Sequence, residues 1–184
     1  MDAKIILDSK ELNLILTRLC HQLIENHDDF SNSVILSLQP RGVFFGNRIA
    51  KTLREILPEA KINYGKLDVT FYRDDFRRRN EVLVPNSTEV DFIIENKKVI
   101  LIDDVLYTGR TIRAALDAML AFGRPEKVEL MVLIDRRFYR HLPVKPDYVG
   151  RTVDSVSSEK VKVFWNETDG KDRIILFTPN DKKQ

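Results

Sequence analysis

The chain contains few of the residues that build disulfide-rich, zinc-binding or repetitive proteins. Its 184 residues include one cysteine, three histidines, seven glycines and seven prolines. The lone Cys20 cannot form an internal disulfide, and its spacing to the histidines fits no zinc site. Glycine and proline are too scarce for collagen or for a low-complexity chain. We therefore expect a folded protein of the reducing cytoplasm, in which oxygen atoms hold any metal.

Long apolar runs and a strong excess of one charge are also missing. No segment approaches the roughly 18 apolar residues that cross a bilayer, and the residues after Met1 lack the apolar core of a secretion signal. The formal net charge is only +2, while 43% of the residues are apolar and 32% charged. This composition predicts one globular domain over residues 1–180, followed by a polar tail at 181–184.

Hydrophobic periodicity predicts alternating helices and strands. Asp8 and Glu11 form a helix-start pattern for an amphipathic helix that runs to about Asn26. A second helix ends at Pro58, and a third, over about 112–120, is stopped by Gly123. Strands are predicted at 34–38, 67–71, 99–102, 128–134, 160–165 and 174–177, the last two near one edge of the sheet. This order predicts an α/β fold with a central, mainly parallel sheet covered by helices on both faces.

The segment most informative about chemistry is residues 99–111. An apolar strand runs into Asp103 and Asp104, and a short loop then leads into a helix. Ligands of parallel sheets bind beyond the carboxyl ends of strands. Gly109 allows close approach of the backbone, and the amides and hydroxyls of residues 107–111 together with the helix dipole favour a phosphate. Because the two acids would repel that phosphate, we expect them to accept hydrogen bonds from hydroxyls or to act on Mg²⁺ through water. Together these features predict a sugar phosphate site.

Two other interpretations of this segment exist. Solvated acidic residues follow many strands, and an acidic pair after a strand also occurs in phospho-acceptor receiver domains. A Walker-type phosphate loop is excluded, since the sequence contains no Gly-Lys-Ser or Gly-Lys-Thr.

The whole of segment 99–111 resembles the phosphoribosyl-pyrophosphate (PRPP) binding motif of type I phosphoribosyltransferases. Other segments are similar to the bacterial pyrimidine-operon attenuation regulators, a family whose members are also uracil phosphoribosyltransferases. These segments are Leu16-Thr17-Arg18-Leu19, Arg41-Gly42, residues 67–75, Arg113-Ala114-Ala115, Gly123-Arg124-Pro125 and residues 147–150. The resemblance covers nearly the whole chain. It implies the type I fold with a flexible lid and a small hood, dependence on Mg²⁺, and homo-oligomers built from dimers.

The resemblance also implies roles in handling PRPP, uracil, UMP and pyrophosphate. Its PRPP-binding positions are Arg41, Gly42, Asp103, Asp104, Val105, Leu106, Tyr107, Thr108, Gly109, Arg110 and Thr111. Asp103, Asp104 and Arg73 are the candidate catalytic residues, and the two acids also face Mg²⁺ through water and PRPP. The Arg41 guanidinium suits the charge of pyrophosphate. Pro40 stands where the family usually has a hydroxyl residue, so one hydrogen bond to the ligand is missing.

A polar segment after residue 72 corresponds to the lid of the family. Arg73 is the residue there that we expect to reach PRPP, whereas Arg77 to Arg79 have the pattern of a solvated charge run.

Tyr107 favours a pyrimidine as the acceptor base. In purine-specific relatives this position is commonly an aspartate that acts on a ring nitrogen, and a tyrosine with a pKa of about 10 is a poor replacement. We expect the base near Asp135, Arg136 and Val153. The match is loosest here, because the family pattern Asp-Arg-Gly-His is replaced by a stretch from Asp135 to His141 that is one residue longer and lacks the glycine.

Members of this family also bind the leader RNA of the pyrimidine operon, with nucleotides setting the affinity. Thr17, Arg18 and His21 match helix positions implicated in RNA contact, although a solvated helix face has the same composition. A locally basic region adds Arg136, Arg137, Arg140, Lys145 and Arg151. Three interpretations remain: a uracil phosphoribosyltransferase with or without attenuation, a PRPP- or nucleotide-sensing RNA regulator with little catalysis, and a phosphoribosyltransferase for another base.

Overall fold

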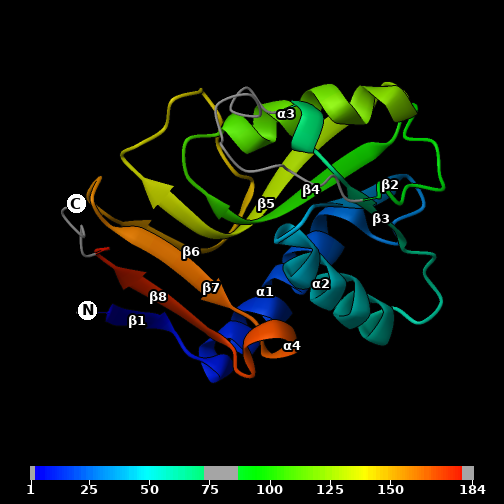
Figure 1. The fold of residues 1–184 in the computed structure, drawn as a ribbon. Helices are drawn as coiled ribbons and strands as arrows, with labels where there is room; N and C mark the ends of the chain where they lie inside the picture. The colour runs from blue at the N-terminus through cyan, green and yellow to red at the C-terminus, as the bar shows by residue number, and fades with distance from the viewer. Residues whose placement is uncertain (1–2, 73–86, 180–184) are drawn as a thin grey trace.

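A five-stranded parallel sheet forms the centre of the molecule (Figure 1). The structure is a computed structural model that describes residues 3–72 and 87–179. The strand order is β3-β2-β4-β5-β6, and every neighbouring pair is parallel. The strands are β2 (Ser33–Leu38), β3 (Asn63–Leu67), β4 (Lys98–Leu106), β5 (Lys127–Arg137) and β6 (Tyr148–Asp154). The predicted parallel α/β architecture is confirmed.

Helices cover both faces of this sheet, as predicted. On one face α1 (Ser9–His27) and α2 (Gly42–Ile56) pack on Ile35, Ile100 and Ile102. On the other face α3 (Arg110–Met119) packs on Val34, Leu36 and Leu101. Alternate residues of β2 and β4 thus enter two separate apolar cores, which is why residues 34–36 and 99–102 form unbroken apolar runs. None of the helices within residues 3–72 and 87–179 combines the length and apolar character needed to cross a membrane.

A second, smaller sheet is built from both ends of the described chain. It has the antiparallel order β1-β8-β7, with β1 (Ala3–Leu7), β7 (Lys160–Phe164) and β8 (Arg173–Phe177), and the short helix α4 (Asn166–Asp169) connects the last two. Figure 1 shows it beside the central sheet, on the side of α1. The prediction that the last two strands lie near an edge of the main sheet is therefore wrong. We call this smaller sheet the hood.

The first helix begins as its sequence predicts. Glu11 N donates to Asp8 Oδ1 over 2.8 Å, and Asp8 N donates to Glu11 Oε2 over 3.0 Å, which forms a reciprocal capping box. The helix ends at His27, one residue after the predicted position. Local hydrogen bonds thus fix where the first element that covers the sheet begins.

The predicted strand over 67–71 differs from the structure. β3 already ends at Leu67, and a 3₁₀ turn, η1 (Thr70–Tyr72), follows it. The Asp68 carboxylate accepts bonds from the Thr70 amide (3.0 Å) and hydroxyl (2.6 Å), and this side-chain turn stops the strand. Leu67 and Val69 are buried on the same side nevertheless, which explains the alternating pattern. The predicted lid residues Arg73 and Arg77 to Arg79 lie outside the described residues.

A buried polar cluster joins α1 to the amino ends of the central strands. His27 Nδ1 lies 2.8 Å from Ser33 Oγ, and its Nε2 lies 2.8 Å from Glu129 Oε2. The Tyr148 hydroxyl donates to the same carboxylate over 2.8 Å. Burial lowers the pKa of His27, although the nearby Glu129 carboxylate opposes that change. The cluster therefore holds a neutral imidazole in the folded protein at neutral pH.

We predict that His27 makes stability depend on pH. Because its pKa is lower in the folded than in the unfolded chain, the unfolded chain binds more protons below about pH 6.5. The contribution of this residue to the free energy of unfolding should therefore fall as the pH is lowered from about 7.5 to about 5.5. Denaturant unfolding of His27→Gln should show a shallower pH slope than wild type. His21→Gln, at an exposed position of the same helix, should retain the wild-type slope, and an equal slope in both variants would contradict the prediction.

Candidate active site

The two predicted acids lie inside β4 rather than after it. β4 extends to Leu106, and both Asp103 and Asp104 are buried, with 8% and 7% of their surface exposed. The Asp104 amide donates to Asp103 Oδ1 over 2.9 Å. Their carboxylates therefore stand at the carboxyl end of the central strand of the sheet, the position at which parallel sheets bind ligands.

The segment from residue 107 to residue 111, which we call the phosphate loop, leads from β4 into α3. Gly109 precedes the helix with a φ of +90°, a left-handed conformation that favours glycine. Gly109 has no side chain to cap the helix, Thr108 Oγ1 accepts from the Arg110 amide over 3.4 Å, and residues 110–113 include no carboxylate. The amides and positive dipole end of α3 are therefore suited to an anion.

Gly42 brings the start of α2 against the acids. A Cβ atom at this position would lie 2.8 Å from the Ile102 carbonyl oxygen and 3.0 Å from Asp103 Cα. These are backbone atoms of β4, so they cannot move aside as a flexible side chain would. The preceding loop includes a cis peptide bond between Gln39 and Pro40. The close contact explains why the predicted Arg41-Gly42 pair requires glycine at its second position.

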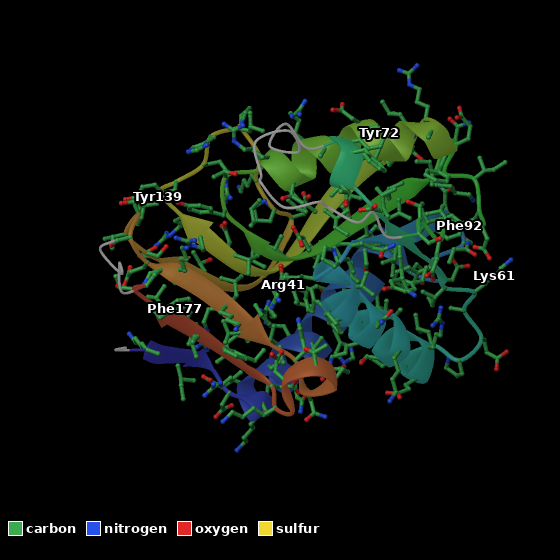
Figure 2. All side chains as sticks on the ribbon, viewed as in Figure 1. Arg41, Lys61, Tyr72, Phe92, Tyr139 and Phe177 are labelled. Atoms are coloured by element: carbon green, nitrogen blue, oxygen red, sulfur yellow. The ribbon has the colours of Figure 1, made fainter. Side chains whose placement is uncertain are left out.

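Arg41 connects the central sheet with the hood. Its Nε donates to Asp104 Oδ2 over 3.1 Å, and its Nη2 donates to the Val163 carbonyl oxygen in β7. Figure 2 shows Arg41 beside β7. Burial raises the pKa of Asp104, and Arg41 offsets only part of that rise. Any ligand that takes Arg41 away from Asp104 must supply a new partner for a buried carboxylate.

A pocket of about 380 Å³ lies between Asp104 and the hood. Its core wall is Arg41, Asp104 and Val105. Its hood wall consists of β7 and β8 residues, namely Lys160, Val161, Lys162, Val163 and Phe177. A larger pocket of about 610 Å³ lies between α2 and β3, but neither acid lines it. Sequence reasoning missed the hood wall, because nothing in the local pattern of β7 indicates that it faces Asp104.

None of the predicted base-binding residues lines this pocket: Arg136 and Asp135 lie near Tyr107, and Val153 lies elsewhere. Arg136 is 5% exposed; its Nε donates to Ser155 Oγ over 3.0 Å, and its guanidinium carbon lies 3.9 Å from the centre of the Tyr107 ring. The Asp135 carboxylate accepts a hydrogen bond from Arg140. Val153 is buried in the core beneath α1. The structure thus brings Arg136 and Tyr107 together and places Val153 among apolar residues.

The helix residues predicted for RNA contact are exposed on α1, but two of them make hydrogen bonds. Arg18 Nη2 donates to the carbonyl oxygens of Val149 (3.0 Å) and Gly150 (2.7 Å) in the edge strand β6. The Thr17 hydroxyl donates to the Asn13 carbonyl oxygen over 3.1 Å. Arg18 therefore covers part of a sheet edge as well as facing solvent.

The arginines of the predicted basic region also have acceptors. Arg137 forms a two-bond pair with the Asp154 carboxylate, at 2.6 and 2.8 Å. Arg151 donates to the Ile6 carbonyl oxygen over 2.6 Å. Much of the positive charge that the sequence concentrates in this region is thus compensated within the chain.

Comparison with known proteins defines the class. Residues 2–168 match the family model of the phosphoribosyl transferase domain. A hypoxanthine phosphoribosyltransferase from Staphylococcus aureus has a TM-score of 0.70 at 19% identity, with 98% of this chain and 94% of that chain covered. The enzyme of that name from Trypanosoma cruzi also has a TM-score of 0.70, at 16% identity, covering 96% and 97%. The fold and the family model together define a phosphoribosyltransferase of the type I fold.

Sequence relatives narrow the class to one family. The bifunctional protein PyrR of Desulfosudis oleivorans is 46% identical over 174 residues, which cover 95% of this chain and 96% of that protein. The protein of the same name from Deinococcus radiodurans is 44% identical, covering 96% and 95%. The chain therefore belongs to the bifunctional PyrR family, as the sequence resemblance implied.

We predict that Gly42→Ala destabilises the protein and displaces the acids. The added Cβ has to separate α2 from β4, so the free energy of unfolding should fall by about 1–3 kcal/mol, a usual cost of overpacking. Urea unfolding measures this change. Lys51→Ala, at an exposed position of the same helix, should stay within about 0.5 kcal/mol of wild type. Wild-type stability of Gly42→Ala would show that α2 can shift without cost.

Proposed function

We propose that this protein transfers the phosphoribosyl group of PRPP to uracil, which yields UMP and pyrophosphate. The observation that carries the proposal is the buried pair Asp103 and Asp104, which lies between the glycine-preceded start of α3 and Arg41. The start of α3 suits an anion, the two carboxylates can accept hydrogen bonds from hydroxyl groups, and Arg41 is a cation. This is the order in which PRPP carries its 5′-phosphate, ribose and pyrophosphate. Membership of the bifunctional PyrR family supports the same conclusion.

In this mechanism the chain binds and orients PRPP and stabilises charge. The amides of the phosphate loop hold the 5′-phosphate, and the two acids accept hydrogen bonds from the ribose hydroxyls. The bond between the anomeric carbon and the pyrophosphate oxygen breaks while a ring nitrogen of the base bonds to that carbon and gives up its proton to water. Arg41 leaves Asp104 and meets the charge that develops on pyrophosphate. The ribose hydroxyls then replace the guanidinium as partners of the buried carboxylate.

The donor set fits a Mg²⁺ ion held mainly by substrate and water. Among the residues that the structure describes, no group of three or more His, Cys, Asp or Glu side chains could hold a metal. Asp103 and Asp104 offer the hard oxygen donors that Mg²⁺ prefers, and this ion usually keeps several waters beside one or two carboxylates and phosphate oxygens. Bound Mg²⁺ neutralises part of the charge of pyrophosphate.

Two features favour uracil as the acceptor. The pocket of about 380 Å³ is lined by four charged residues and by Val105, Val161, Val163 and Phe177, and these four apolar side chains suit a planar ring. The Tyr107 ring packs against the Arg136 guanidinium, and its centre lies 6.2 Å from that of Tyr139. Contacts to its aromatic ring thus hold Tyr107 in place. This arrangement suits a nucleobase whose reaction needs no general acid or general base at this position.

We further propose a second activity, the binding of pyrimidine-operon leader RNA. Relatives named bifunctional support two activities in one chain, and Thr17, Arg18 and His21 are exposed together on α1. We also propose that the protein acts in the cytoplasm, where the buried Cys20 stays reduced, and that it assembles into oligomers built from dimers.

Base selectivity tests the main proposal. With PRPP and Mg²⁺ present, pyrophosphate release should depend on added uracil and should be absent with guanine or hypoxanthine. A coupled pyrophosphate assay over this panel measures it. Turnover with a purine alone would contradict the argument from Tyr107. Absence of turnover with every base, together with leader RNA binding that weakens steeply with salt, would identify a regulator with little catalysis.

Replacing Asp104 by asparagine should reduce turnover with uracil by about 100-fold, since an amide retains the shape but loses the charge that the ribose hydroxyls and Mg²⁺ require. Circular dichroism should remain that of the wild type. Asp117→Asn, on the exposed surface of α3, should leave turnover unchanged. Wild-type turnover in Asp104→Asn would remove this residue from the mechanism.

A further inference from the structure

We propose that Arg140 is a positioning residue. It binds the phosphate loop on the side away from the ligand, so that the amides of the loop face the 5′-phosphate. This inference rests on the proposed function, because it concerns how the same site binds PRPP. Arg140 belongs to residues 138–144, which follow β5 and which we call the strap. It makes no contact with the pocket between β4 and the hood, so it acts through the loop.

Three hydrogen bonds join the strap to the phosphate loop, and an ion pair joins the strap to β5. Arg140 Nη1 donates to the Tyr107 carbonyl oxygen, and its Nη2 donates to the Asp135 carboxylate. The amides of His141 (3.0 Å) and Leu142 (3.3 Å) both donate to the Thr108 carbonyl oxygen. Two successive carbonyl groups of the loop therefore point toward the strap.

This direction determines where the loop amides point. In a trans peptide the C=O of one residue and the N–H of the next point to opposite sides of the chain. Since the Tyr107 and Thr108 carbonyls face the strap, the N–H groups of Thr108 and Gly109 face away from it. They belong to the loop that begins α3, where the amides and the helix dipole favour an anion. The strap thus sets the direction of two phosphate donors without approaching the ligand.

Arg140 is the part of the strap that can hold this arrangement firmly. Its side chain is 21% exposed and that of Asp135 is 13% exposed, so the ion pair is largely shielded from water. Packing reinforces the contact, because a Cβ on Gly109 would lie 3.3 Å from Val144 Cγ2. The guanidinium therefore connects the end of β5 to the phosphate loop at a fixed separation.

The neighbouring arginines make different contacts and supply a control. Arg136 lies over the face of the Tyr107 ring and donates to the Glu159 carbonyl oxygen over 2.8 Å. Arg137 pairs with Asp154 on the surface, where both side chains are more than half exposed. Of these three, Arg140 is the one that donates to the backbone of the phosphate loop. Arg137, the last residue of β5, thus serves as a control: it is a nearby arginine without that contact.

The test compares ligands that carry a 5′-phosphate with one that does not. Calorimetry should give Arg140→Gln a dissociation constant about tenfold higher for Mg²⁺-PRPP and for UMP, because the loop spends less time in its binding conformation. Mg²⁺-pyrophosphate, which needs no phosphate loop, should bind within about twofold of wild type. In turnover with uracil, KM for PRPP should rise while kcat at saturation stays within about twofold.

Two further variants complete the experiment. Arg140→Lys, which keeps the charge and can reach one of the two acceptors, should recover part of the PRPP affinity and serves if Arg140→Gln fails to fold. Arg137→Gln should bind all three ligands as wild type does. Wild-type PRPP affinity in both Arg140 variants, or an equal loss for pyrophosphate, would overturn the proposal. If wild type binds pyrophosphate but neither PRPP nor UMP, the proposed function falls and this inference falls with it.

Discussion

Two adjacent carboxylates buried at the end of a central strand are the constraint on which the rest of the site depends. Water solvates neither Asp103 nor Asp104 well, so the protein must provide partners. Asp103 accepts from the Asp104 amide, and Asp104 accepts from Arg41. Arg41 in turn reaches the hood through Val163, and Gly42 allows its helix to approach β4 closely enough. One electrostatic requirement thus connects the sheet, α2 and the hood.

The architecture separates the rigid part of the molecule from the part that handles ligands. β2, β4 and β5 are buried on both faces, and a polar cluster around His27 joins α1 to their amino ends. The opposite ends carry the acids, the phosphate loop and the strap. The ligand-binding groups and the His27 cluster therefore lie at opposite ends of the same strands.

Sequence reasoning correctly predicted the structural features that are encoded by residues close together in the sequence. The capping box of α1, the apolar strand before Asp103 and the glycine-containing turn into α3 each depend on neighbours in sequence. The hood was misplaced because β1 pairs with β8, and no local pattern reports a contact across most of the chain. The alternation at 67–71 continues through a turn made by the Asp68 side chain, so it indicated a strand where none forms. The pocket wall from β7 was missed for the same long-range reason.

The pairing of β1 with β8 has a consequence for biosynthesis (Figure 1). Of the described strands, β1 leaves the ribosome before the others, whereas its partner β8 is translated after them. Until β8 emerges, β1 lacks that partner, and β7 lacks the neighbour that completes its sheet. A nascent chain can therefore assemble the central sheet before it can close the wall facing Asp104. The pocket wall formed by β7 and Phe177 is therefore among the last parts of the described chain to form.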